Sequence, residues 1–421
     1  MSLHRLRRLA ATAAAVLVAP AVAGAVLAAE PASAAGALAP TVTALTTAPV
    51  VGAAARFRFG TAAGSAPVTQ FVFSLNSGPG GRVTAANGRA TASVVVERAV
   101  NVLSVYAVAA DGSVSDSTVT TFNAAFPPPA ADQDLDSDGK PDLLAVGGTP
   151  GLAPGLWQAT GRGLRGQVRT PAVDIGVNGN GVGTPFTGAQ VFTGKFRGGP
   201  FEDVFVYYPG GINPGSGMII DGLGRGEPLR ADRGYEATLS AGLFADINND
   251  NPLQLVNAYD GSGNHFAYPD LLGIVGSPAN GYTLQYYASQ NGTANFAFPT
   301  QLGTATPTGG GDWEHWRLAS KLLPSGTAVA LWNQSTGALY LWQGVTYDQG
   351  TGALAFTQFR LADAWLPGAQ LSELQLTDVN ADGVPDLWAV TPDGTVTAYV
   401  ITNLSATGPA KLTAKTPQHL T

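Results

Sequence analysis

The fold is decided by Pro141-Asp142-Leu143-Leu144-Ala145-Val146, a short apolar strand led by an aspartate. The pattern recurs as Pro269-Asp270-Leu271-Leu272-Gly273-Ile274 and as Pro385-Asp386-Leu387-Trp388-Ala389-Val390, at spacings of 128 and 116 residues. Degenerate copies begin at Glu202 and Ala328, near the midpoint of each spacing. Because self-similarity at a fixed period indicates a repeat architecture, we divide residues 132–421 into five units of about 60 residues.

Each unit has the same order of features. A lead-in strand such as 190–196 is followed by a polar loop, the apolar strand, a glycine turn and a further strand. One four-stranded sheet cannot bury both of its faces alone, whereas a ring of such sheets can. We therefore predict an all-β protein in which 132–421 form a β-propeller of about five four-stranded blades. A linear stack of the same units is the competing arrangement.

The sequence pattern of residues 41–125 predicts a separate small β domain. Arg56-Phe57-Arg58-Phe59 alternates polar and apolar side chains as a half-buried strand does, and Asp111-Gly112 suits a tight hairpin. About seven short strands in this length favour an immunoglobulin-like β-sandwich. Residues 126–131 contain three consecutive prolines, which favour an extended linker.

The first 34 residues have the features of a signal peptide. A basic segment, 4–8, precedes an apolar run, 9–27, and Ala32-Ser33-Ala34 is a small-x-small cleavage site. A membrane anchor is the alternative, since the apolar run is nearly long enough to span a bilayer. We expect cleavage, a secreted or cell-surface location, and no membrane span afterwards.

The composition excludes several classes of function. The formal net charge is −7, which argues against nucleic acid and anionic membranes because both require basic surfaces. The chain has no cysteine, so disulfides and cysteine-ligated metals are excluded. Acidic side chains remain available to bind cations.

Two loops crowd carboxylate and amide groups ahead of the apolar strand, at 134–142 and 378–386. Both read Asp-x-Asp/Asn-x-Asp-Gly-x-Pro-Asp, and calcium takes six to eight oxygen ligands at about 2.3–2.6 Å. Alternate residues of a tight turn aim three side chains at one point, the seventh residue offers its carbonyl, and the ninth closes the cage. Without a cation these groups repel one another. An ordinary hydrated turn is the alternative.

These repeated loops resemble the FG-GAP or VCBS-type repeats of integrin-α-like β-propellers and of secreted bacterial proteins, and the leader and sandwich resemble exported actinobacterial proteins. The resemblance covers residues 130–421 and implies a calcium ion between the first two strands of a blade. Carried over by position, it implies two sets of Ca²⁺ ligands: Asp134, Asp136, Asp138, the Lys140 carbonyl and Asp142; and Asp378, Asn380, Asp382, the Val384 carbonyl and Asp386.

The middle unit holds two weaker candidates for metal binding. One loop lacks the glycine at its sixth position, and the other carries two extra residues before its closing aspartate, so an ordinary turn is an equal alternative for each. Their candidate ligands are Asp246, Asn248 and Asp250, and Asp260, Ser262, Asn264 and Asp270.

Units two and four place a lysine where the first aspartate belongs. Lys195 and Lys321 would repel calcium, so we predict that both units are metal-free. Lys195 is expected either to pair with Asp203 or to point into solvent, and solvent is the favoured position for Lys321.

No catalytic constellation stands out in the sequence. A Gly-x-Ser-x-Gly elbow is absent, no two histidines are spaced as zinc ligands, and Asp312 with Glu314 is a weak acid pair. All seven tryptophans follow residue 156, where they either stack on glycans or fill gaps between blades. We therefore expect a non-enzymatic adhesion protein that binds an extracellular glycan or protein surface. A polysaccharide-active glycoside hydrolase or lyase, and a structural envelope spacer, are the alternatives.

Overall fold

The computed structural model describes residues 37–78, 80–163, 166–176, 186–211, 213–225 and 236–421. Within them the chain forms β-strands, turns and the 3-10 helix η2 (Trp313–His315), which confirms the predicted all-β class. The predicted signal peptide, 1–34, lies outside the described residues. No helix in the described part of the chain is long and apolar enough to cross a membrane.

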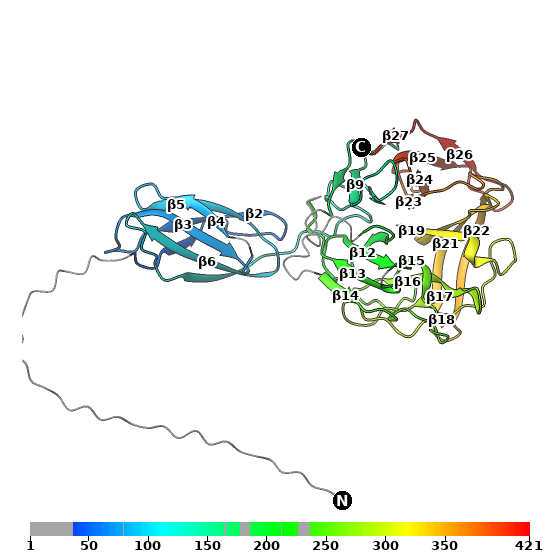
Figure 1. The fold of residues 1–421 in the computed structure, drawn as a ribbon, viewed down its shortest axis with the longest axis horizontal. Coiled ribbons are helices and arrows are strands. Elements are labelled where there is room, and N and C mark those ends of the chain that lie inside the picture. Colours follow the sequence, from blue (N-terminus) through cyan, green and yellow to red (C-terminus); the bar gives the residue numbers. More distant parts are fainter. Residues whose placement is uncertain (1–36, 79, 164–165, 177–185, 212, 226–235) are drawn as a thin grey trace, which may run out of the picture.

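Seven strands build the N-terminal unit, on the left in Figure 1. Two sheets, in the orders β1-β2-β5 and β4-β3-β6-β7, share one hydrophobic core. Alternation places Phe57 and Phe59 of β2 in that core against Phe71, as the sequence predicted. The strands are β1 (Thr41–Ala44), β2 (Ala54–Gly60), β3 (Val68–Leu75), β4 (Gly81–Thr84), β5 (Arg89–Val95), β6 (Val100–Ala109) and β7 (Thr118–Asn123).

The remaining strands form five antiparallel sheets, in the orders β8-β9-β10, β11 to β14, β15 to β18, β19 to β22 and β23 to β26, with β27 paired to β25. The first two sheets contain β8 (Asp142–Val146), β9 (Leu156–Thr160), β10 (Val173–Asp174), β11 (Gln190–Gly194), β12 (Asp203–Tyr208), β13 (Ser216–Ile220) and β14 (Glu236–Leu239). The third contains β15 (Pro252–Tyr259), β16 (Asp270–Ser277), β17 (Gly281–Tyr287) and β18 (Thr300–Gln301).

The fourth sheet contains β19 (Trp316–Leu323), β20 (Gly326–Asn333), β21 (Leu339–Asp348) and β22 (Ala353–Ala362). The fifth contains β23 (Glu373–Thr377), β24 (Asp386–Val390), β25 (Thr395–Thr402), β26 (Lys411–Ala414) and β27 (Gln418–His419). The second, third and fourth sheets have the predicted four strands, whereas the described first sheet has three and the fifth has five.

The five sheets contact one another in a cycle, which Figure 1 shows as the rounded body on the right. β11 contacts β15, β15 contacts β19, β19 contacts β23, and β8 contacts both β23 and β11. The chain end reinforces the junction of first and last sheets, because the Ala172 N–H donates to the Leu420 carbonyl at 2.6 Å. The Gln418 side chain also bonds both backbone groups of Val168, at 3.0 and 3.1 Å.

Glutamine side chains join the inner strands of this cycle. The Gln254 amide of β15 donates to the Leu318 carbonyl of β19 at 2.7 Å and accepts from the Leu318 N–H at 2.9 Å. Gln190 of β11 bonds β15 in the same two-way manner, and Gln375 of β23 bonds β8. These amides bond to backbone N–H and C=O groups at the inner edge of each sheet, where no further strand pairs with them.

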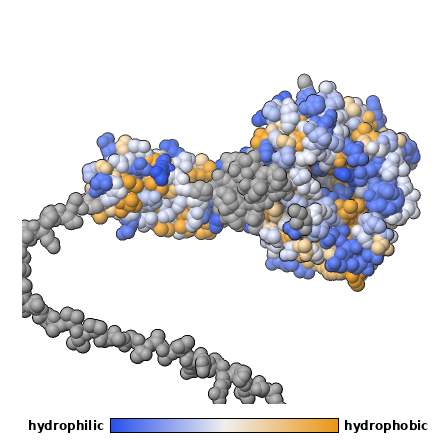
Figure 2. Space-filling model, in the orientation of Figure 1, coloured by the Kyte–Doolittle hydropathy of each residue, from blue (hydrophilic) through white to orange (hydrophobic). Residues whose placement is uncertain are grey.

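The two units touch directly through Phe201, which lies beside β12 and packs into the core of the N-terminal unit. A side chain at Gly52 would meet the Phe201 ring at 2.9 Å, so this glycine permits the close approach. On the face shown in Figure 2, hydrophilic residues dominate the five-sheet unit and apolar residues are scattered among them.

Candidate functional site

The first predicted metal loop folds around Asp134, which is 1% exposed. Its carboxylate accepts the Asp138 N–H at 3.0 Å and the Gly139 N–H at 2.9 Å, and Asp136 also accepts the Asp138 N–H at 3.1 Å. Ser137 and Gly139 have positive φ angles of 59° and 84°, which turn the chain tightly enough to gather the alternate side chains.

The loop brings three carboxylates together. Asp134, Asp136 and Asp138 each offer one oxygen, and these three oxygens lie within 4.8 Å of one another. Two oxygens on opposite sides of a calcium ion are about 5 Å apart, so the spacing suits a cation of that size. Burial and then the charges of Asp136 and Asp138 raise the pKa of Asp134. Lys140, whose carbonyl is a predicted ligand, uses its ammonium to pair with Asp138 at 2.7 Å.

The second predicted loop has the same conformation. The Asp378 carboxylate accepts the Asp382 N–H at 3.2 Å and the Gly383 N–H at 2.9 Å, and Asn380 accepts the Asp382 N–H at 3.1 Å. The positive φ angles recur at Ala381, 58°, and Gly383, 81°. The N–H of Val384, the other predicted carbonyl ligand, donates to Asp382 at 2.8 Å. Two separate stretches of sequence therefore build one arrangement of side chains.

The ninth-position acids have a different environment from the cluster. Asp142 accepts hydrogen bonds from the Leu135 N–H at 3.0 Å, the Gln158 amide at 2.7 Å and the Gly161 N–H at 3.3 Å. Asp386 likewise accepts backbone N–H groups through both oxygens, as do Asp203 and Asp270 in sheets without the full motif. Burial raises the pKa of Asp142 and of Asp386 to about 7. This acid fastens the loop to the sheet in four of the five sheets.

The two middle-unit candidate loops each make their own set of contacts. Asp260 bonds the His265 ring at 2.9 Å, Asn264 donates to the Ser289 carbonyl at 2.9 Å, and Asp270 accepts the Ser262 N–H at 2.9 Å. The other loop precedes β15, at the opposite end of the sheet from 260–269. There Asp246 accepts the N–H groups of Asn248 and Asp250, while the Asp250 carboxylate is bonded by Ser277 and Asn280.

Both lysines lie elsewhere than predicted. Lys195 pairs with Glu202 at 2.7 Å rather than with Asp203, whose two oxygens are taken by backbone N–H groups. Lys321 is 7% exposed and pairs with Asp132 at 3.1 Å, so the expectation of a solvent-facing lysine was wrong. The partner of Lys321 is Asp132, at the start of the repeat region, and the local sequence around Lys321 did not indicate it.

Six of the seven tryptophans are buried in clusters that join neighbouring sheets: Trp313, Trp316, Trp332, Trp342, Trp365 and Trp388. They fill gaps between sheets, so stacking on a surface glycan is excluded for these six. Asp312 bonds the Trp316 indole at 3.3 Å and the Asn333 amide at 3.2 Å. Asp312 therefore holds the start of β19.

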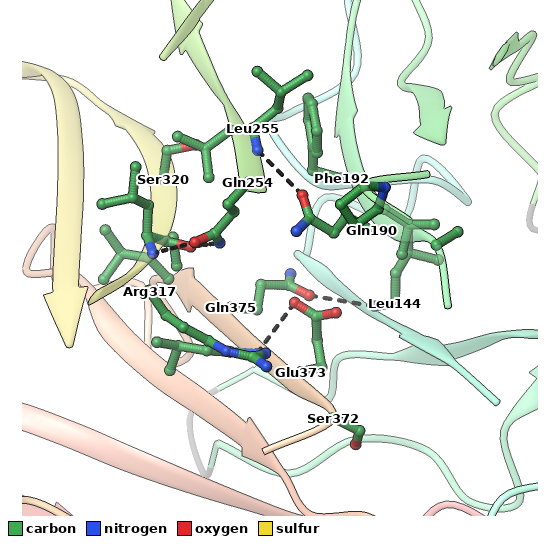
Figure 3. Close-up of a pocket in the computed structure, with 18 of the residues that line it drawn as sticks. Leu144, Gln190, Phe192, Gln254, Leu255, Arg317, Ser320, Ser372, Glu373 and Gln375 are labelled. Atoms are coloured by element: carbon green, nitrogen blue, oxygen red, sulfur yellow. Dashed lines mark hydrogen bonds between the residues drawn. The ribbon is translucent and has the colours of Figure 1, made fainter. Parts of the chain in front are cut away.

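A cavity of about 410 Å³ lies between the inner strands β11, β15, β19 and β23. Figure 3 shows Arg317 and Glu373 reaching toward each other within it, beside the glutamine bridges. Burial raises the pKa of Glu373 to about 8, against the opposing charge of Arg317. Sequence reasoning missed both residues. The signal that could have indicated them is a polar residue within each lead-in strand, at Gln190, Gln254, Arg317 and Gln375.

No protein-family profile and no curated protein matches the chain. Among solved structures, it is similar to rhamnogalacturonan lyase YesW at 12% identity and a TM-score of 0.28, over 90% of this chain and 68% of that one. AofleA from Arthrobotrys oligospora matches at 13% identity and a TM-score of 0.33, over 75% of this chain and 83% of that one. An auxiliary nutrient binding protein from Bacteroides ovatus matches at 12% and 0.25, over 86% of both chains. Likeness at these TM-scores transfers neither fold nor function.

Proposed function

We propose that the chain is a secreted, calcium-binding protein in which an immunoglobulin-like sandwich precedes a five-bladed β-propeller of FG-GAP or VCBS type. Its role is non-enzymatic binding outside the cell, with a glycan or protein as partner. The cycle of contacts among five sheets supports the propeller, because each sheet covers the face that its neighbour leaves open.

One observation carries the calcium assignment: 134–139 and 378–383 adopt the same turn and gather the same kinds of oxygen ligand. Asp134, Asp136 and Asp138 would hold one ion, and Asp378, Asn380 and Asp382 the other. Calcium bound there would neutralise the crowded carboxylates and stabilise each loop. Calcium suits all-oxygen sites of flexible geometry better than magnesium, which demands shorter octahedral bonds.

Thermal unfolding tests this assignment. A ligand that binds only the folded chain adds about 2.7 kcal/mol at one hundred times its Kd. Chelator-treated protein should therefore melt at a lower temperature, calcium should restore the melting temperature, and magnesium should restore less of it. Identical melting curves in chelator and in millimolar calcium would remove the calcium assignment.

A polysaccharide-active enzyme is the second candidate, favoured by one observation. Glu314 and Glu373 both line the central cavity, and glycoside hydrolysis uses two carboxyl groups, one of them with a raised pKa. Release of reducing ends from a panel of polysaccharides, lost in Glu373→Gln, would establish this activity. No release by the wild-type protein would leave binding as the function.

A further inference from the structure

The loop between β11 and β12 carries an aromatic side chain where the aspartate loops carry a predicted carbonyl ligand. Aligned on Lys195, Phe201 is the seventh residue of its loop and corresponds to Lys140 and Val384 in the first and fifth sheets. Phe201 is only 8% exposed. It belongs to the hydrophobic core of the N-terminal unit, the other buried members of which lie between residues 51 and 107. A side chain of the repeat region therefore completes the core of the neighbouring unit.

Two glycines, one from each unit, make room for the Phe201 ring. A Cβ at Gly52, in the N-terminal unit, would meet the ring at 2.9 Å, and a Cβ at Gly224, in the five-sheet unit, would overlap it. Both glycines have positive φ angles, 84° and 65°, which residues with a side chain rarely adopt. The Cβ at Gly52 would also lie 3.3 Å from the Leu223 carbonyl, so the backbones of the two units approach each other closely. The socket is therefore shaped by both units around one aromatic ring.

Charged groups and the linker lie around this socket. Asp221 follows β13 and forms a salt bridge of 2.7 Å with Arg197, in the same loop as Phe201. Burial raises the pKa of Asp221 to about 6, and the charges of Arg197 and of Arg98, which belongs to the N-terminal unit, oppose this rise. The linker is bonded to the loop as well, since the Ala130 N–H donates to the Pro200 carbonyl at 2.7 Å. Apolar contact at the centre and charge at the rim are the arrangement of a specific interface.

The conformation of loop 195–203 is fixed by its own contacts. Lys195 pairs with Glu202, and the Arg197 N–H donates to Asp203 at 2.8 Å. The loop therefore presents Phe201 from a defined backbone, and β12 and β13 lie on the side of the ring that faces the N-terminal unit (Figure 1). An anchor held in one conformation loses little entropy when it enters its socket.

We propose that loop 195–203 is the docking element for the N-terminal unit and that Phe201 holds the sandwich and the five-sheet ring as one rigid body. Where the first and fifth sheets gather oxygen ligands, the second sheet presents an aromatic anchor. A partner that contacts both units would meet two surfaces at a fixed separation. This inference goes beyond the proposed binding role, and it depends neither on calcium nor on the identity of the ligand.

The distance between two spin labels, one in each unit of the full chain, tests the proposal. The chain has no cysteine, so the variants Ser93→Cys, on β5, and Ser240→Cys, after β14, can be labelled specifically at two exposed positions. Double electron–electron resonance should give one narrow distance distribution. Phe201→Ala should make it about twofold wider, because domains without a hydrophobic interface move relative to one another. Phe298→Ala, at a phenylalanine that is 69% exposed, is the matched control and should leave it narrow.

Further variants separate the anchor from the linker and from a folding defect. Replacement of the three prolines at 127–129 by serine should leave the distribution narrow, because the interface and not the linker sets the distance. Phe201→Leu keeps an apolar side chain and should give an intermediate width. Tryptophan fluorescence checks that the ring is folded in each variant, since all seven tryptophans follow residue 156.

A broad distribution in the wild-type chain would overturn the proposal, and so would a wild-type width in Phe201→Ala. If Phe201→Ala does not fold, a wild-type width in Phe201→Leu has the same consequence. Broadening by the serine linker alone would assign the fixed separation to the prolines instead of Phe201.

Discussion

Asp134 and Lys195 occupy the same place in the repeat, eight residues ahead of the buried aspartate that fastens the loop to its sheet. In the first and fifth sheets this place begins a loop that gathers carboxylate and amide oxygens. In the second sheet a lysine ammonium pairs with Glu202 at 2.7 Å. The same place in the repeat therefore either begins a group of side-chain oxygens, which we propose to hold a metal ion, or carries a lysine that pairs with a neighbouring acid.

The positions of the two kinds of loop explain the difference. Lys195 and Lys321 both donate to the segment 130–132, at the Ala130 carbonyl and the Asp132 carbonyl, each at 2.9 Å. The next residue, Gln133, donates to the carbonyls of Ser320 on β19 and Leu376 on β23. The aspartate loops belong to the first and fifth sheets, which meet where the chain closes the ring. Lysines anchor the start of the repeat, and metal would stabilise its closing junction.

The largest expected effect comes from Lys321→Met. The change removes the ammonium that pairs with Asp132 and leaves the Leu322 N–H and the Tyr259 hydroxyl as donors to its carboxylate, and loss of one member of a buried pair costs about 3–5 kcal/mol. Chemical denaturation should show this loss with calcium present and absent alike. The double variant Lys321→Met with Asp132→Asn removes both charges and should recover part of it; a single variant as stable as wild type would show that the pair contributes nothing.

Lys195→Met should cause a smaller loss that grows with pH. Burial and the charge of Asp132 raise the pKa of Glu202, and Lys195 opposes this. A carboxyl with a raised pKa holds its proton more tightly in the folded chain than in the unfolded chain. The contribution of Glu202 to the free energy of unfolding is therefore complete below about pH 4.5 and is lost as the pH rises through its pKa in the folded chain. Without Lys195 the pKa of Glu202 rises further, so the stability of the Lys195→Met variant should decline more steeply than that of wild type from pH 5 to pH 9. Glu202→Gln should flatten the curve, and parallel curves for wild type and Lys195→Met would contradict the account.

The smallest effect is expected from Asp260→Ala in the third sheet. The Asp260 side chain is 40% exposed and bonds His265, and the Asn264 amide donates to the Ser289 carbonyl. Stability should change by no more than about 0.5 kcal/mol, and the calcium stoichiometry should stay the same. Loss of a calcium site in this variant would extend the metal loops to the third sheet.

The sequence identified the aspartate loops because their geometry is local. Asp and Gly at fixed spacing dictate the positive φ angles and the turn, which depend little on the rest of the fold. The partners of the lysines were missed because they depend on tertiary packing: Asp132 lies 189 residues from Lys321 and becomes its neighbour only when the ring forms.

The ninth-position aspartates show a related ambiguity. A buried acceptor of backbone N–H groups and a calcium ligand both require a carboxylate, so Asp142 and Asp386 matched the motif while the structure places them in a role shared with Asp203. Arg317 and Glu373 escaped notice because a single charged residue in a strand usually faces solvent, and the centre of the ring exists only in the folded chain.

Calorimetric titration of calcium into chelator-treated protein tests the central claim most directly. The account predicts two sites in the wild-type chain and one site in Asp136→Ala or in Asp382→Ala, because each change removes a ligand from one loop and leaves the other loop intact. The double variant should bind none, and Asp363→Ala, at an exposed acid outside both loops, should keep two. Full wild-type binding in the double variant would contradict the assignment of calcium to these loops.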